Sequence, residues 1–175
     1  MSGLGDITMS FEDRFKVQKC FTLLNKDVDM STLDKRIIFQ KTIYLLKAFG
    51  VNLNYYFSWY LRGPYSTTLA DDGYALNSLE PESRLELTHD VDVESDMVFI
   101  NKTKDFIKDL EENLQTRNER SRLELSASLH FLSKYTLNGK GGFERAYQRL
   151  RFHKPRFNKR EASCVWKLME KHKLI

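Results

Sequence analysis

The sequence predicts a mainly α protein with a small β element, an α+β fold in one compact domain. Apolar residues recur at helical spacing over most of the 175 residues. Residues 55–61 are rich in aromatics and alternate as a strand does. Three prolines and eight glycines are too few for a turn-rich sandwich or barrel. We therefore expect a compact helical domain with a short hairpin or small sheet and a three-helix C-terminal lobe.

The length fits a single domain over residues 1–175. Within it we expect two sub-lobes, residues 11–116 with helices and the small sheet, and residues 122–175 as a basic helical lobe. No apolar run approaches the length of a transmembrane helix, and residues 1–15 lack the basic and apolar regions of a secretory signal. These features predict no membrane partner.

Cys20 and Cys164 lie in separate predicted helices and have no CxxC spacing. Two such cysteines indicate a reducing compartment, so the expected location is cytoplasmic.

The first two expected helices are residues 11–26 and a helix that ends near Phe49. Ser31 or Thr32 is the predicted N-cap of the second helix, and Gly50 is its predicted C-terminal cap because glycine accepts positive φ. Apolar side chains cover most of the second helix, which predicts a central place in the core. Its expected polar strip consists of Arg36, Gln40 and Lys47.

Residues 55–61 are predicted to form a strand with both faces covered, because both faces carry aromatic side chains. Arg62 to Tyr65 should then turn the chain, since Pro64 fixes its own φ and keeps Gly63 out of the α region. Ser66 is the expected N-cap of a helix over residues 67–79.

Residues 80–96 are acidic and short of apolar groups, which predicts a β-hairpin or an irregular loop that ends in an edge strand at residues 97–100. A helix should follow over residues 102–116. Residues 117–122 are expected to form a charged break or a solvated helix stretch.

Three helices are expected in the last third. The first covers residues 122–136, and the glycines between 139 and 142 end it. A short helix over residues 143–152 follows, and Asn158 is the predicted N-cap of the final helix.

The net charge of +4 hides an internal asymmetry. Residues 67–116 hold 4 Lys or Arg and 13 Asp or Glu, whereas residues 117–175 hold 15 and 5. The acidic middle could neutralise the basic end within one fold, or could leave a basic face free for an anionic partner.

The basic end contains the candidate nucleic-acid-binding residues, which are interleaved with aromatic side chains as in surfaces that bind phosphates and stack on bases. They are Arg145, Arg149, Arg151, Lys154, Arg156, Lys159 and Arg160. Two short helices joined by a turn are also typical of a helix-turn-helix. The alternative is a solvated charged face that pairs in part with the acidic middle.

Two weaker candidates have simpler explanations. Arg62 beside the Gly-Pro corner and a helix N-terminus could hold an anion, but a strand-to-helix corner needs the same residues. The alternating carboxylates of Asp90, Asp92, Glu94 and Asp96 could bind Ca²⁺, but the spacing of a calcium loop is missing, and a solvated acidic loop is the favoured interpretation.

No catalytic motif is visible. The four histidines, His89, His130, His153 and His172, do not have metal-binding spacing, and no nucleophile or phosphate-loop motif is present. A catalytic site assembled only by folding would leave no such signal. We therefore predict no enzyme activity, no cofactor and no metal.

Several short segments resemble a known family. The segments Ile38–Leu45, Trp59–Ser66 and Leu69–Asp72 resemble the YwgA-like family of uncharacterised prokaryotic proteins and, more distantly, the Panacea (SocA-like) antitoxin domain. Leu125–Leu132 and His153–Phe157 are similar to the C-terminal half of YwgA-like chains. The residues that carry the resemblance are Gln40, Lys41, Tyr44, Trp59, Arg62, Gly63, Pro64, Tyr65 and Ser66, and Phe39 stands where the family usually has Leu. The resemblance implies a structural role for these residues, which would hold helix to strand.

The resemblance also implies either a predicted transcriptional regulator or a protein that neutralises or recruits another protein. We therefore expect a non-enzymatic regulatory protein that binds nucleic acid through the basic C-terminal helical face. The alternative is a protein-binding antitoxin or adaptor-type module without a nucleic-acid role.

Overall fold

The computed structural model describes residues 4–175, with side chains from Glu12 onward. Residues 1–3 lie outside the described residues. The expected domain and the segment that lacks a secretory signal both begin there. The mainly α, α+β fold class is confirmed, because the described residues form eight α-helices and one two-stranded antiparallel sheet.

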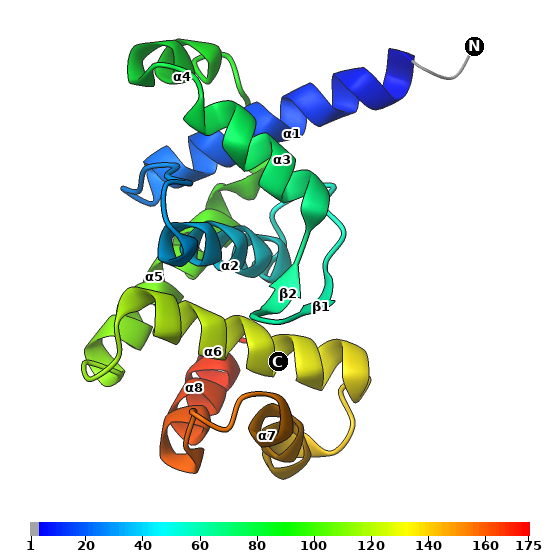
Figure 1. The fold of residues 1–175 in the computed structure, drawn as a ribbon, viewed down its shortest axis with the longest axis vertical. Helices are drawn as coiled ribbons and strands as arrows, with labels where there is room; N and C mark the ends of the chain where they lie inside the picture. Colours follow the sequence, from blue (N-terminus) through cyan, green and yellow to red (C-terminus); the bar gives the residue numbers. More distant parts are fainter. Residues whose placement is uncertain (1–3) are drawn as a thin grey trace.

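The elements follow one another along the chain, and Figure 1 labels most of them. They are α1 (Leu4–Leu23), α2 (Leu33–Phe49), β1 (Ser58–Tyr60), β2 (Gly63–Tyr65), α3 (Thr67–Asn77), α4 (Pro81–Leu87), the 3₁₀ turn η1 (Glu94–Asp96), α5 (Met97–Asn113), α6 (Glu119–Phe131), the π segment η2 (Leu132–Thr136), α7 (Gly142–His153) and α8 (Lys159–Lys171).

The helices form two groups on either side of α2 (Figure 1). One group holds α1, α3 and α4, and the other holds α6, α7 and α8. The hairpin of β1 and β2 lies beside α2, between α3 and α6. The two groups therefore meet across α2 and the short hairpin, with α5 contributing Ile100 to one core and Phe106 to the other.

Helix α2 lies between the two hydrophobic cores and contributes side chains to both. Phe39, Ile43 and Leu46 pack into the core with α1 and α3. Tyr44 and Leu45 pack into the core formed with α5, α6, α7 and α8. This explains why apolar residues cover most of the circumference of α2, and the predicted central place of the helix is confirmed.

The predicted caps of α2 are also confirmed. The Thr32 side chain accepts a hydrogen bond from the Lys35 amide at 3.2 Å. Gly50 ends the helix with a φ of 120°, which a glycine adopts without a Cβ clash.

The sequence predicted a polar strip along α2, but its polar side chains do not form a solvated strip. Gln40 is buried and exchanges two hydrogen bonds with the Ser66 backbone, at 2.8 and 3.0 Å. Lys47 donates to the carbonyls of Leu53 and Tyr55. Because the segment between α2 and α3 has little secondary structure, these side chains satisfy backbone groups that would otherwise lack partners.

The predicted strand over residues 55–61 is wrong in length, and the predicted turn is part of the sheet. Only Ser58–Tyr60 forms a strand, and Gly63–Tyr65 pairs with it through Ser58↔Tyr65 and Tyr60↔Gly63. Gly63 has a φ of 89°, which only glycine adopts without strain. With two strands, one face of the sheet stays open, so Tyr60 is 58% exposed.

The predicted hairpin or loop over residues 80–96 and the edge strand at 97–100 are wrong. Residues 81–87 form α4, and Met97 begins α5. No side chain of α4 is buried, so its sequence carries no amphipathic stripe. Pro81 at the first helical position was the available signal.

The last third contains the three expected helices with shifted ends. α6 begins at Glu119, inside the segment predicted to be a charged break or a solvated helix stretch, and its last turn widens into η2. Phe106 and Leu110 of α5 pack with these helices, so one core spans the expected boundary between the sub-lobes.

Candidate nucleic-acid interface

Helix α7 packs on the core through a few apolar side chains and exposes several arginines to solvent. Ala146 and Leu150 are buried and attach the helix to the core. Arg145 and Arg149, one helical turn apart, are exposed, as is Arg151. The helix thus buries one narrow stripe, and three arginines stand among its exposed positions.

Helix α8 begins with two exposed cations, Lys159 and Arg160, although cations are unfavourable near the positive end of a helix dipole. A capping box supports this end of the helix: Asn158 accepts from the Glu161 amide at 2.9 Å, and Glu161 accepts from the Asn158 amide at 3.1 Å. The predicted cap at Asn158 is confirmed. The two cations therefore have no evident stabilising role in the helix.

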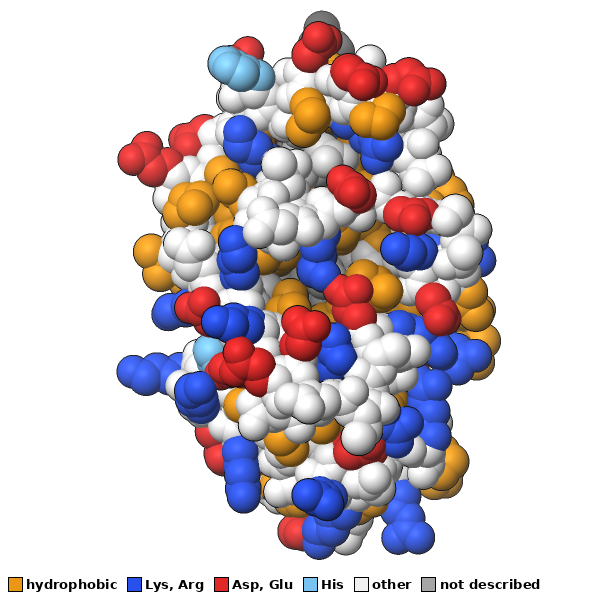
Figure 2. Space-filling model, turned by 90° about the vertical axis from the view of Figure 1, so that its left-hand side faces the viewer, with side chains coloured by type: hydrophobic (Ala, Val, Ile, Leu, Met, Phe, Trp, Pro, Cys, Tyr) orange, Lys and Arg blue, Asp and Glu red, His pale blue; other side chains and the backbone are white. Residues whose placement is uncertain are grey.

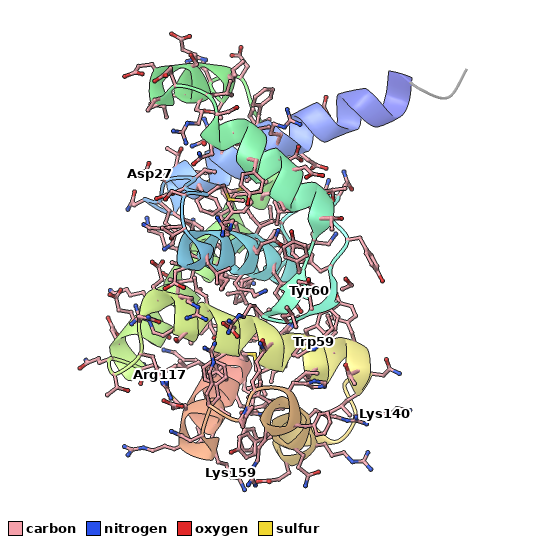
Figure 3. All side chains as sticks on the ribbon, in the orientation of Figure 1. Asp27, Trp59, Tyr60, Arg117, Lys140 and Lys159 are labelled. Atoms are coloured by element: carbon pink, nitrogen blue, oxygen red, sulfur yellow. The ribbon has the colours of Figure 1, made fainter. Side chains whose placement is uncertain are left out.

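Four of the seven candidate residues are exposed and form no ion pair with any described residue. They are Arg145, Arg149, Arg151 and Arg160. Lys159 pairs with Glu144 at 2.7 Å, but both side chains are more than half exposed, and such a pair is weak in water. Figure 3 shows Lys140 and Lys159 extending from the end of the molecule formed by α7 and α8.

The acidic middle does not cover these arginines. Asp72 pairs with Arg14 at 2.8 Å, and Asp96 pairs with Lys16. Asp109 reaches the last third, where it pairs with Lys171 and His172, each at 2.6 Å. On the face in Figure 2, Lys and Arg are numerous over the half that holds α6, α7 and α8, and Asp and Glu lie at the end that holds α4 and across the middle.

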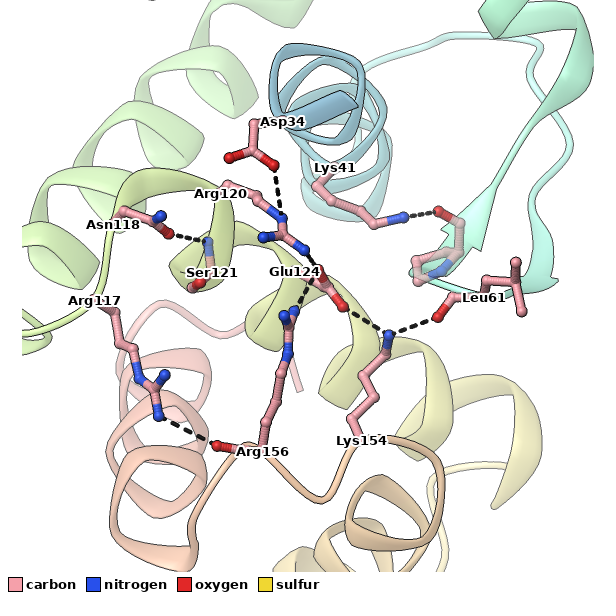
Figure 4. A network of polar contacts seen from close by, with 11 residues as sticks. Asp34, Lys41, Leu61, Arg117, Asn118, Arg120, Ser121, Glu124, Lys154 and Arg156 are labelled. Atoms are coloured by element: carbon pink, nitrogen blue, oxygen red, sulfur yellow. Dashed lines mark hydrogen bonds and ion pairs between the residues drawn. The ribbon is translucent and has the colours of Figure 1, made fainter. Parts of the chain in front are cut away.

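Lys154 does not belong to the surface that the sequence predicted. It is 5% exposed, and its ammonium lies 2.8 Å from the Glu124 carboxylate and 3.2 Å from the Leu61 carbonyl (Figure 4). Buried Lys154 joins the turn after α7 to α6 and to the hairpin. Its role is to hold the arginine-bearing helices in place.

Glu124 gathers several cations. Arg156 lies 2.6 Å from its carboxylate, and Arg120 lies 3.6 Å away and also pairs with Asp34 (Figure 4). Arg156 is therefore tied to the fold, although its side chain remains 36% exposed. We call Glu124, Lys154, Arg156 and Arg120 the Glu124 cluster.

Burial acts strongly on the cations near Glu124. Desolvation lowers the pKa of Lys154, and the hydrogen bond to Glu124 opposes that shift. Desolvation also lowers the pKa of Lys41 to about 7, while the charge of Glu124 raises it and that of Lys154 lowers it further. The cations outnumber the single buried carboxylate, so the region carries excess positive charge.

The residues that carry the sequence resemblance lie at the junction of α2, the hairpin and α6. Lys41 is buried and donates to the Pro64 carbonyl. Ser66 caps α3, as predicted, by accepting from the Leu69 amide. Trp59 packs against the ring of His153, with centroids 5.1 Å apart, and Arg62 is exposed. The structure thus brings the motif next to the turn after α7.

Tyr44 and His130 form a buried polar contact. The Tyr44 hydroxyl lies 2.7 Å from His130 Nδ1. Burial lowers the pKa of His130 to about 4, so the ring is neutral at pH 7. His130 therefore has a structural place in the core.

The described residues hold no group of three or more His, Cys, Asp or Glu side chains that could bind a metal ion. Asp96, one of the alternating carboxylates, is buried against Lys16 and the Asn52 amide. Cys20 and Cys164 are free thiols, and burial raises the pKa of each.

Comparisons with family models, with curated proteins and with solved structures found no match to the chain. No helix in the described part of the chain has both the length and the apolar content needed to cross a membrane.

Glu124, the carboxylate at the centre of the Glu124 cluster, was not predicted from the sequence. In the sequence it is one charged residue within a helical pattern, next to Leu123 and Leu125. Its burial depends on cations from α6 and from the turn after α7, which only the fold brings together.

Proposed function

We propose that the protein is a non-enzymatic regulator that binds nucleic acid through the exposed cations of α7 and α8. The observation that carries the proposal is the set of four exposed arginines without an ion pair among the described residues, at Arg145, Arg149, Arg151 and Arg160. Exposed arginines without an ion-pair partner favour binding to a polyanion, because each can neutralise a phosphate and release a counterion. We further propose a cytoplasmic location, for which the free thiols give support.

The arrangement of α7, the turn at residues 154–158 and α8 supports a contact with a duplex groove. In a helix-turn-helix, the N-terminal residues of the second helix approach base edges. Lys159 and Arg160 occupy that position on α8. The Glu124 cluster would fix the angle between the two helices.

The test is binding to labelled DNA and RNA over a series of salt concentrations. For a protein that neutralises several phosphates, affinity should fall by orders of magnitude between about 50 and 200 mM salt. A variant with Arg145, Arg149, Arg151 and Arg160 changed to Gln should bind more weakly, and its salt slope should fall by about one unit for each phosphate that the variant no longer neutralises.

A matched control carries Lys35, Lys102, Lys104 and Lys108 changed to Gln, which removes the same charge from exposed positions on α2 and α5. It should bind as the unmodified protein does. Equal losses of affinity in the two variants, or binding that does not respond to salt, would overturn the proposal.

The alternative function is a protein-binding antitoxin or adaptor module, in line with the Panacea-like resemblance. Leu61, 79% exposed at the hairpin tip, and its neighbour Tyr60, 58% exposed, favour this alternative because they offer adjacent apolar surface to a protein partner. A pull-down that returns one stoichiometric protein, and that fails with Leu61→Ser, would support it.

A further inference from the structure

A pocket of about 210 Å³ opens between α2, the hairpin and α3. Apolar side chains such as Ile37 and Ala70 form part of its wall, and three tyrosines, Tyr60, Tyr65 and Tyr74, form another part. Its basic lining residues are Arg36, Lys41 and Arg62, and no described Asp or Glu lines it. The pocket therefore suits a ligand with a planar or apolar body and a negative charge nearby.

The tyrosines leave aromatic surface uncovered. Tyr60 is 58% exposed and Tyr74 is 51% exposed. The rings of Tyr60 and Tyr65 lie with centroids 5.5 Å apart and an interplanar angle of 39°. Asp71 acts electrostatically on Tyr65 but is not part of the lining. Exposed aromatic rings at the mouth of a pocket are the platform on which an unpaired base stacks.

Positive charge connects the pocket to the Glu124 cluster. Arg62, exposed and without an ion pair among the described residues, acts on the pKa of Lys154, as does Arg156. Lys41 lines the pocket, and the charges of Glu124 and Lys154 both shift its pKa. Its ammonium can donate three hydrogen bonds, of which the Pro64 carbonyl accepts one. The Glu124 carboxylate thus interacts with basic side chains from α2, from α6 and from the turn after α7.

The hairpin also connects the pocket to α7. Lys154 donates to the Leu61 carbonyl (Figure 4), and Trp59 contacts His153 at the end of α7. Beyond His153 lie Phe152, 82% exposed, and Arg151. Aromatic and cationic groups therefore continue from the pocket to the arginines of α7.

We propose that this pocket binds one unpaired base of a single-stranded nucleic acid, whose flanking phosphates lie against Arg62 and Arg156. The inference rests on the proposed function, and it adds a preference for single strands to it. A base inside a duplex is stacked on its neighbours and cannot enter such a pocket. A polyanion suits the surface better than an acidic peptide, because cations flank the pocket and continue along α7.

The test compares binding of a single-stranded oligonucleotide that contains 2-aminopurine with binding of the same sequence as a duplex. The full chain should bind the single strand more tightly, and 2-aminopurine fluorescence should change on binding. Tyr60→Ala and Tyr74→Ala should each weaken single-strand binding by about tenfold and leave duplex binding unchanged.

Tyr56→Ala is the matched control, because Tyr56 is 83% exposed in the segment before β1 and does not line this pocket. It should bind both probes as the unmodified protein does. If the two tyrosine variants bind the single strand normally while the arginine variant does not, the base pocket is wrong and the proposed function stands. If neither probe binds, both fail. If the pocket instead binds a peptide rich in Glu and Tyr, and Tyr74→Ala abolishes that binding, the pocket is a protein site and the inference is overturned.

Discussion

The ammonium of Lys154 lies 2.8 Å from the carboxylate of Glu124, and the two side chains are 4% and 1% exposed. This buried pair joins the turn after α7 to the middle of α6. Because Arg156 and Arg120 approach the same carboxylate, Glu124 balances more charge than Lys154 does.

Removal of Glu124 should therefore cost more than removal of Lys154. Glu124→Gln leaves three cations without their buried counter-charge, and we expect it to lower the free energy of unfolding by about 3–5 kcal/mol. Lys154→Met should cost less, because Arg156 and Arg120 still face the carboxylate. The double variant should cost less than the sum of the two. Denaturant unfolding measures all three, and equal single-variant costs would contradict this account.

Lys41 should make stability rise with pH. Its pKa is about 7 in the folded protein against an ordinary value of 10.5, so between these pH values the unfolded chain binds more protons than the folded one. The free energy of unfolding then gains up to about 1.4 kcal/mol per pH unit from this residue, and the gain is lost as pH falls towards 7. Lys41→Met should have a smaller slope in a denaturant series from pH 7 to 10. Identical slopes would show that Lys41 stays charged in the fold.

Gly63 should not tolerate a side chain. Its φ of 89° disfavours any L-residue, and a Cβ there would collide with Ser128 Oγ on α6. Gly63→Ala should cost about 1–3 kcal/mol more than Gly139→Ala, in which φ is also positive but nothing lies within 4 Å. Ser128→Ala should recover part of the loss by removing the hydroxyl. Thermal unfolding of Gly63→Ala, Gly139→Ala, Ser128→Ala and the Gly63→Ala, Ser128→Ala double variant tests the packing of the hairpin on α6.

Phe152 should matter for binding and not for folding. Its ring is 82% exposed between Arg151 and His153 at the end of α7. Phe152→Ala should change the free energy of unfolding by less than about 0.5 kcal/mol. It should weaken nucleic-acid binding by about 1–3 kcal/mol if a base stacks there. Leu85→Ala, at an exposed site on α4, is the control for removal of an apolar surface group. A Phe152→Ala protein that binds normally would remove this ring from the interface.

Local signals in the sequence predicted the elements that depend on local chemistry. The caps at Thr32, Ser66 and Asn158 are visible in the sequence, because each side chain bonds an amide three residues away. Gly50 marks the end of α2 for a similar reason. Helix α4 escaped prediction because it buries none of its side chains, so its sequence has no stripe to read.

The candidate site was predicted only in part. The sequence shows that Arg145 and Lys154 are both cations in one basic segment, but their exposure depends on what packs against them. Lys154 meets a carboxylate 30 residues away, and Arg145 meets none among the described residues. The pocket joins residues from α2, the hairpin and α3, and no spacing rule connects them.

Because α2 serves as a common wall for both cores, neither half of the chain has a complete interior without it. A fragment that begins at α6 would carry the arginines but would expose the apolar residues that normally pack on Tyr44 and Leu45. The molecule should therefore unfold in a single thermal transition. A fragment that contains only the cationic end should not fold by itself.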